Sequence, residues 1–160
     1  MTEYELLLDE SYNEGIEVFE MPLESDSMGL CDGSLIALNT RFLYTSVQKR
    51  YFLSEEVWHY RVTVGDITDT TNVSNLKQEY FARKCNILDV ASQDKIVKAL
   101  LCTYTEQEFC DYLGIPVEAL PEIITFYKNK YGLYYRCKDY TLYFEPLSTV
   151  GSSIKGDENI

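Results

Sequence analysis

The residues Ser46–Val62, which read SVQKRYFLSEEVWHYRV, decide how this chain is expected to fold. Val47, Tyr51 and Trp58 lie on or near one stripe at helical spacing, and Gly65 follows shortly after the segment. The pattern predicts a helix over 46–62. Everything else in the chain is arranged before or after this helix.

The residues before this helix predict a shorter helix and a small sheet. Thr2 and Glu5 have the spacing of a capping box, which predicts a helix from about 3 to 13. Two segments rich in β-branched and other apolar residues, 16–21 and 34–39, predict strands, with a loop containing glycine and aspartate between them. The expected fold class is therefore α+β.

The residues after it predict a mainly helical second half. Asn75 and Gln78 resemble the cap of a helix, and four of its apolar residues are expected to face a core: Leu76, Phe81, Cys85 and Leu88. A polar loop from about 65 to 74 would join this helix to the previous one.

Further helix signals follow at short intervals. Ser92 predicts the start of a third helix, Thr105 with Glu108 predicts a fourth, and Pro116 introduces a fifth that ends near Gly132. The tyrosine-rich residues 134–144 predict a β-hairpin that turns at Lys138-Asp139, and 147–160 predict a mobile tail. We expect a core over 1–101, a helical subdomain with the hairpin over 102–146, and the tail over 147–160.

Charge and cysteine usage narrow the function class. The chain of 160 residues has 14 lysines and arginines against 26 acidic residues, a formal net charge of -12. Such a surface repels phosphate backbones and favours a basic protein partner, so direct binding of nucleic acid is not expected. The five cysteines include no C-x-x-C pair, which indicates reduced thiols in a cytosolic protein. No secretion signal or membrane span is expected.

A helical E-E-x-x-H pattern is the strongest chemical signal. His59, the only histidine, follows Glu55 by four residues and Glu56 by three. On a helix Glu55 and His59 point the same way, as the two histidines of H-E-x-x-H do when they bind zinc, and Glu56 takes the position of the general base. The alternative interpretation is a solvent-exposed helix face with a hydrogen-bonded histidine.

Glu79, expected on the following helix, is the candidate third metal ligand. Two carboxylates and one imidazole form a harder and more anionic ligand set than two histidines and a glutamate. Zn²⁺ is the first candidate, and this harder ligand set lets Mn²⁺ or Mg²⁺ compete with it better. Asp66 and Asp69 are alternative ligands, although aspartate is also common in loops and caps.

Several segments together resemble the ImmA/IrrE family of phage and mobile-element metallopeptidases. The similar segments are 12–18, 35–38, 55–60 with 63–67, 72–75 with 77–79 and 82–83, 131–132 and 143–146. The resemblance covers nearly all of the chain except the tail. Glu55 stands where the family usually has its first histidine, a variant found in phage members, and Trp58 stands where the family usually has glycine.

The resemblance implies a zincin-like fold and a cytoplasmic metallo-endopeptidase that cleaves a helix-turn-helix repressor, and thereby acts as an antirepressor. It implies Glu56 as the general base and His59 and Glu79 as ligands, with Glu55 as the variant ligand. We expect the substrate to bind as an extended strand near 34–39.

Two other functions stay open. The first is a catalytically degenerate peptidase fold that binds a repressor or another basic protein without cutting it, which an indole at Trp58 beside the metal would favour. The second is an acidic decoy that mimics nucleic acid. Residues 105–131 superficially resemble a helix-turn-helix, but five acidic residues against two lysines predict a packing or docking subdomain instead.

Overall fold

A computed structural model describes residues 1–62 and 73–151 of the chain. Most of the polar loop expected from about 65 to 74, and with it Asp66 and Asp69, lies outside the described residues. The fold class is α+β, as the sequence predicts, and the chain divides into two compact units. Unit 1 comprises Met1–Val90 with Gly114–Pro116, and unit 2 comprises Ala91–Leu113 with Val117–Ile160.

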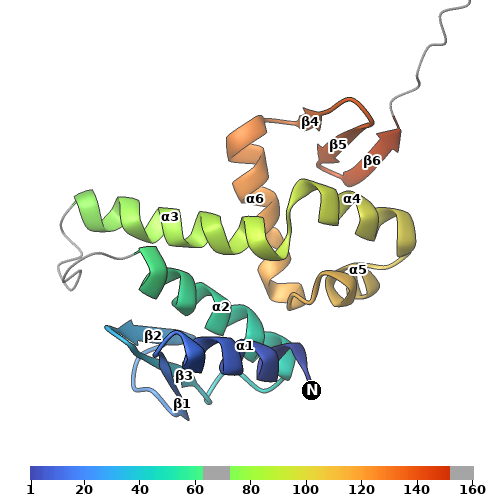
Figure 1. Ribbon diagram of the computed structural model, residues 1–160. Coiled ribbons are helices and arrows are strands. Elements are labelled where there is room, and N and C mark those ends of the chain that lie inside the picture. Colours follow the sequence, from blue (N-terminus) through green and yellow to red (C-terminus); the bar gives the residue numbers. More distant parts are fainter. Residues whose placement is uncertain (63–72, 152–160) are drawn as a thin grey trace, which may run out of the picture. The chain divides into compact units, whose positions relative to one another are not determined.

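Unit 1 contains a small mixed sheet and three helices (Figure 1). Helix α2 packs against β2 and β3 on one side and against α3 on another. Strand β3 lies in the centre of the sheet, parallel to β1 and antiparallel to β2. The elements are α1 (Glu3–Asn13), β1 (Glu17–Met21), β2 (Gly29–Asp32), β3 (Leu35–Asn39), α2 (Ser46–Val62) and α3 (Val73–Val90).

The predicted start of α1 is confirmed in atomic detail. The Glu5 amide donates to Thr2 Oγ1 at 3.2 Å, and the Thr2 amide donates to Glu5 Oε2 at 2.6 Å, which completes the capping box. The bounds predicted for α2 also agree with the structure.

The loop between β1 and β3 contains a strand that the sequence analysis did not predict. Strand β2 follows a turn that is ordered by Asn39, which is fully buried. The Asn39 amide nitrogen donates to the carbonyl oxygens of Ser25 and Ser27, and its Oδ1 accepts from the Leu23 and Arg41 amides. One buried side chain thus replaces the missing backbone partners of the turn.

The core of unit 1 lies between the sheet and its helices. Residues 36 and 38 of β3 point inward, and the fully buried members of this core are Ile16, Ile36, Leu38, Leu53 and Val57. The face predicted for α3 is wrong. Leu76 and Phe81 are exposed, Cys85 and Leu88 are only partly buried, and the buried face carries Ala82, Asn86, Ile87 and Val90. Helix α3 packs on α2 with the side that this face belongs to. The positions on that side recur with the 3.6-residue helical period: 79, 82, 83, 86, 87 and 90.

Unit 2 joins three helices to an antiparallel sheet. Its elements are α4 (Gln93–Cys102), α5 (Glu106–Leu113), the 3-10 helix η1 (Val117–Ala119), α6 (Leu120–Tyr131), β4 (Tyr134–Arg136), β5 (Tyr140–Phe144) and β6 (Leu147–Gly151). The predicted caps at Ser92 and Thr105 are confirmed, as is the hairpin of β4 and β5.

Two predicted boundaries need correction. The unit boundary lies between Val90 and Ala91 rather than after residue 101, because α4 packs on α5 and β6 of unit 2. The predicted tail begins too early, because Leu147–Gly151 forms β6 and pairs with β5. The rest of that tail, 152–160, lies outside the described residues.

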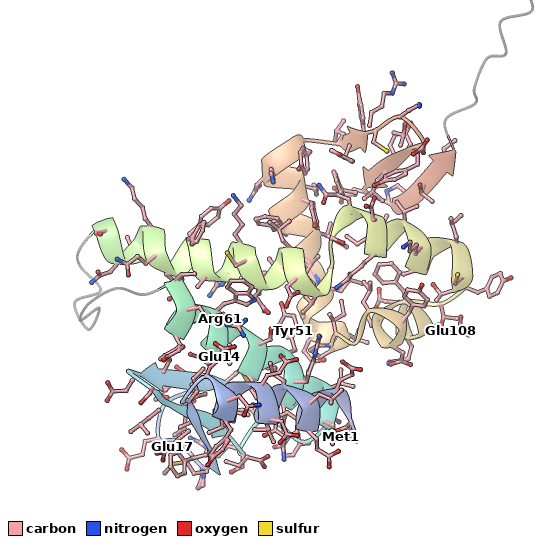
Figure 2. The ribbon with its side chains drawn as sticks, viewed as in Figure 1. Met1, Glu14, Glu17, Tyr51, Arg61 and Glu108 are labelled. Carbon is pink, nitrogen blue, oxygen red and sulfur yellow. The ribbon has the colours of Figure 1, made fainter. Side chains whose placement is uncertain are left out.

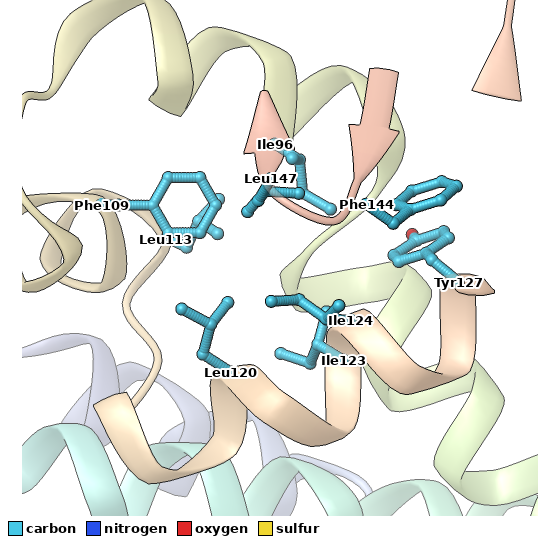
Figure 3. Close-up of a pocket in the computed structure, with 9 residues that line it drawn as sticks. All are labelled: Ile96, Phe109, Leu113, Leu120, Ile123, Ile124, Tyr127, Phe144 and Leu147. Atoms are coloured by element: carbon cyan, nitrogen blue, oxygen red, sulfur yellow. The ribbon is translucent and has the colours of Figure 1, made fainter. Parts of the chain in front are cut away.

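The core of unit 2 is apolar and aromatic (Figure 3). Tyr127 of α6 stacks on Phe144 of β5 with ring centroids 5.6 Å apart, and its hydroxyl donates to the Ala91 carbonyl at 2.6 Å. A cavity of only about 10 Å³ remains among these side chains, too small for more than one water molecule. All five cysteines of the chain are free thiols.

Candidate metal centre

Two helices of unit 1 bring three candidate ligands together. Glu55 and His59 lie one turn apart on α2, and Glu79 lies near the start of α3. His59 Nε2 is 3.5 Å from Glu79 Oε1, and one ligand atom from each of the three residues lies within 4.8 Å of the other two. The predicted convergence of His59 and Glu79 is therefore confirmed, whereas their role as metal ligands stays a prediction.

Arg83 also reaches this cluster. It lies one turn after Glu79 on α3, and its Nη2 is 3.4 Å from Glu79 Oε1. Its Nε is 3.6 Å from Glu55 Oε1. The guanidinium group thus contacts both carboxylates, and one of the oxygens that it contacts also faces His59. A metal ion at this cluster would compete with Arg83 for the same oxygens.

His59 is held in the form that binds metals. The residue is buried, and desolvation lowers the pKa of its imidazole; Glu79 opposes this shift, and Arg83 adds to it. A lowered pKa keeps the ring neutral at neutral pH, with a nitrogen lone pair available. The Nε2 atom is the one directed at Glu79.

Glu56 lies on another side of α2, against the sheet. Burial, followed by the charges of Glu55 and Glu79, raises the pKa of its carboxyl to about 8. A Cβ atom at Gly29 of β2 would stand 2.8 Å from Glu56 Cγ and 2.9 Å from Oε1. A side chain at position 29 would therefore have to displace Glu56. Burial, and then the charge of Glu56, raises the pKa of the nearby Cys31 thiol to about 11.

The donor set fits a divalent cation. Two ligands bound to zinc at about 2.0–2.1 Å in tetrahedral geometry lie about 3.4 Å apart, close to the separation of His59 Nε2 and Glu79 Oε1. The widest separation, up to 4.8 Å, requires a shift of at most about 1.4 Å by a flexible glutamate. Carboxylate and imidazole ligands suit Zn²⁺ and Mn²⁺.

Trp58 has its described contact away from the cluster. Its indole ring lies under Arg61, with the guanidinium carbon 5.2 Å from the ring centroid. Arg61 pairs with Glu14, which follows α1, and Figure 2 shows these two side chains directed toward each other. Adjacent residues on a helix point about 100° apart, which separates Trp58 from His59. The indole nitrogen is buried and has no hydrogen-bond partner among the described residues.

Two residues of this region were missed by the sequence analysis as parts of the site. Gly29 carries a signal only once β2 is known, because glycine inside a strand often marks the close approach of another group. Arg83 had a weaker one, because arginine four residues after Glu79 on a helix can pair with it. The alternative ligands Asp66 and Asp69 lie outside the described residues.

Comparisons with protein-family models, with curated proteins and with solved structures find no match. Within residues 1–62 and 73–151, no helix has the length and apolar character needed to cross a membrane.

Proposed function

We propose that this protein is a metal-dependent endopeptidase of the ImmA/IrrE type, located in the cytoplasm, and that its substrate is a helix-turn-helix repressor of a phage or mobile element. The observation that carries the proposal is the convergence of Glu55, His59 and Glu79, with the buried carboxyl of Glu56 on the same helix. A bound Zn²⁺ or Mn²⁺ would acidify a water molecule and polarise the scissile carbonyl.

Each residue has a distinct role in this proposal. His59, Glu79 and Glu55 would hold the cation through one nitrogen and two carboxylates. The positive charge of a bound cation would lower the pKa of Glu56 from about 8, and the ionised carboxylate would then accept the proton of the attacking water and deliver it to the leaving amine. Gly29 leaves the space in which the Glu56 carboxyl lies.

We place the substrate-binding site at the edge of the sheet beside Glu56. The sequence predicts that the substrate binds near 34–39, but Leu35–Asn39 of that segment forms β3, and both edges of β3 are already paired with β1 and β2. Strand β2 is an edge strand of this sheet, and its Gly29 touches Glu56. An extended peptide paired with β2 would place its backbone next to the base.

A second function is favoured by Arg83. Its guanidinium contacts two of the three candidate ligands. This positively charged side chain therefore already interacts with carboxylates that a metal ion would bind. In a degenerate member of such a fold, this ion-pair network would hold α2 and α3 together without metal, and the protein would bind its partner without cutting it.

Cleavage of a repressor encoded beside the protein separates these functions. Wild-type protein, Glu56→Gln and a surface control, Glu24→Gln, are incubated with the repressor and either Zn²⁺ or Mn²⁺, and the fragments are identified by mass spectrometry. The peptidase proposal expects cleavage by wild type and control, with a rate at least about 10²-fold lower for Glu56→Gln. Intact repressor that still forms a complex with all three proteins would favour the binding function.

A further inference from the structure

The outer face of the sheet in unit 1 is apolar and has no helix on it in the described structure. Alternation along the strands sends Ile36 and Leu38 of β3 into the core, so the other set of side chains points outward. That set includes four large apolar residues, each 46–47% exposed: Phe19, Met21, Leu30 and Leu35. We refer to these four residues as the outer apolar face.

The pairing register makes this face continuous. Phe19 of β1 pairs with Ala37 of β3, which pairs in turn with Leu30 of β2, so one row crosses all three strands. Met21 is two residues after Phe19 and Leu35 is two residues before Ala37, so both lie on the same side of the sheet. Apolar residues on three adjacent strands form a surface, whereas single exposed apolar residues need no explanation.

Two carboxylates border this surface. Leu35 pairs with Glu17 on β1 and with Asp32 on β2, so acidic residues stand on both sides of it in one row. Both carboxylates are on exposed residues, and neither forms an ion pair with a described lysine or arginine. The edges of the surface therefore favour a binding partner that carries positive charges beside its apolar residues.

The dimensions suit one helix. Three strands about 4.8 Å apart span about 10 Å, which is the diameter of an α-helix with its side chains. Strands of five residues are about 17 Å long and match about 11 helical residues. We propose that the outer apolar face is a docking surface for one basic amphipathic helix of a protein partner.

A second copy of this chain fits the surface poorly. Four half-exposed apolar residues offer roughly 400 Å², about half of the ~800 Å² that each partner of a stable interface buries. A symmetric contact would also bring Glu17 and Asp32 of two acidic chains together. A partner helix with an apolar stripe and lysine or arginine on both flanks meets neither difficulty.

The proposed surface is linked to Glu56 through one strand. On β2, Leu30 points outward while Gly29 contacts Glu56. A partner anchored on the outer apolar face can therefore continue along the β2 edge. The docking itself requires neither metal nor cleavage. The docking proposal can therefore be tested independently of the proposed peptidase activity.

The test uses a fluorescent synthetic helix of about 14 residues with leucines on one stripe and lysines on both flanks. The controls are a scrambled peptide of the same composition and a helix with glutamates in place of the lysines. Anisotropy titrations compare wild type with Leu30→Ser, with Phe19→Ser, with the double variant Glu17→Gln and Asp32→Asn, and with Leu101→Ser. Leu101 is a highly exposed residue of α4 and serves as the matched control.

The proposal expects the amphipathic helix to bind wild type and Leu101→Ser equally, and at least about tenfold more tightly than either serine variant on the outer apolar face. Neutralising Glu17 and Asp32 should weaken binding and reduce its salt dependence. Circular dichroism checks that each variant is folded. Equal binding of the scrambled peptide, unchanged binding by Leu30→Ser and Phe19→Ser, or a wild-type dimer that Leu30→Ser converts to monomer would each overturn the proposal.

Discussion

The interiors of the two units differ in how they accommodate polar groups. Unit 2 is closed by stacked aromatic and aliphatic side chains, and the hydroxyl of its buried Tyr127 is hydrogen-bonded to Ala91. Unit 1 buries Glu56 beside the sheet. Within the part of the chain that the structure describes, both amide atoms of Asn86 and the indole nitrogen of Trp58 have no hydrogen-bond partners. Buried polar groups without partners reduce stability. Their concentration around α2 and α3 is typical of a region retained for function rather than for stability.

The largest expected effect comes from damaging the well-packed unit. Phe144→Ala removes a side chain that is 1% exposed and stacked on Tyr127, so we expect it to destabilise unit 2 by about 3–5 kcal/mol. Hydrogen exchange measured by mass spectrometry reports the two units separately. Faster exchange in α4 and α6 with little change in α1 and α2 is expected, and equal acceleration throughout the chain would contradict the division into two units.

Removing the buried carboxyl of Glu56 should stabilise the protein, whereas Phe144→Ala should destabilise it. In metal-free protein the pKa of Glu56 is about 8 when folded and near 4.5 when unfolded, so the folded state holds one more proton between these values. Unfolding then releases a proton, and stability falls as pH rises from about 4.5 to 8.

Glu56→Gln removes this titration. We therefore expect the variant to be more stable than wild type above pH 8, with a smaller gap near pH 5, in urea denaturation with a chelator present. Glu24→Gln, in an exposed loop, serves as the control. A Glu56→Gln variant that is less stable than wild type at pH 8 would mean that the carboxylate makes favourable interactions in the fold.

The sequence could predict the helices better than the site that they form. Local signals, such as the capping box at Thr2 and the Ser92 cap, depend on a few neighbouring residues and were correct. Strand β2 has only four residues, and its pairing with β3 is not encoded locally. Because Gly29 lies on that strand, the close approach of Glu56 to the sheet could not be predicted either.

The cluster itself was only partly predictable. The spacing of Glu55 and His59 follows from helix geometry, but the approach of Glu79 depends on how α3 packs against α2. The error in the buried face of α3 has the same origin, since Leu76 and Phe81 are apolar yet exposed. The contact of Arg83 with Glu55 joins two helices and cannot be read from either one alone.

A smaller effect concerns the competition between Arg83 and a metal. Arg83→Gln removes the guanidinium from Glu55 and Glu79, so we expect divalent metal to bind about tenfold more tightly, or by about 1.4 kcal/mol. Lys84→Gln removes the same charge from the next position of α3 and should change the affinity much less. Weaker binding by Arg83→Gln would instead mean that Arg83 holds the ligands in place.

The smallest expected effect concerns the amide without partners in unit 1. Asn86 is 1% exposed, and neither its Oδ1 nor its Nδ2 has a hydrogen-bond partner in residues 1–62 and 73–151. Asn86→Leu replaces it with an apolar side chain of similar size, so we expect a gain of about 1 kcal/mol in thermal or urea unfolding. A loss of stability would indicate that a bound water or ligand satisfies this amide.

Direct metal titration tests the central claim, which is that Glu55, His59 and Glu79 form a divalent metal site. Isothermal calorimetry with Zn²⁺ and Mn²⁺ is performed on chelator-treated wild type, His59→Ala, Glu79→Gln and Glu56→Gln. We predict one bound metal for wild type and Glu56→Gln, and loss of binding in His59→Ala, with at least about tenfold weaker binding in Glu79→Gln. Wild-type protein that binds neither metal, or binds as tightly after His59→Ala, would contradict the account.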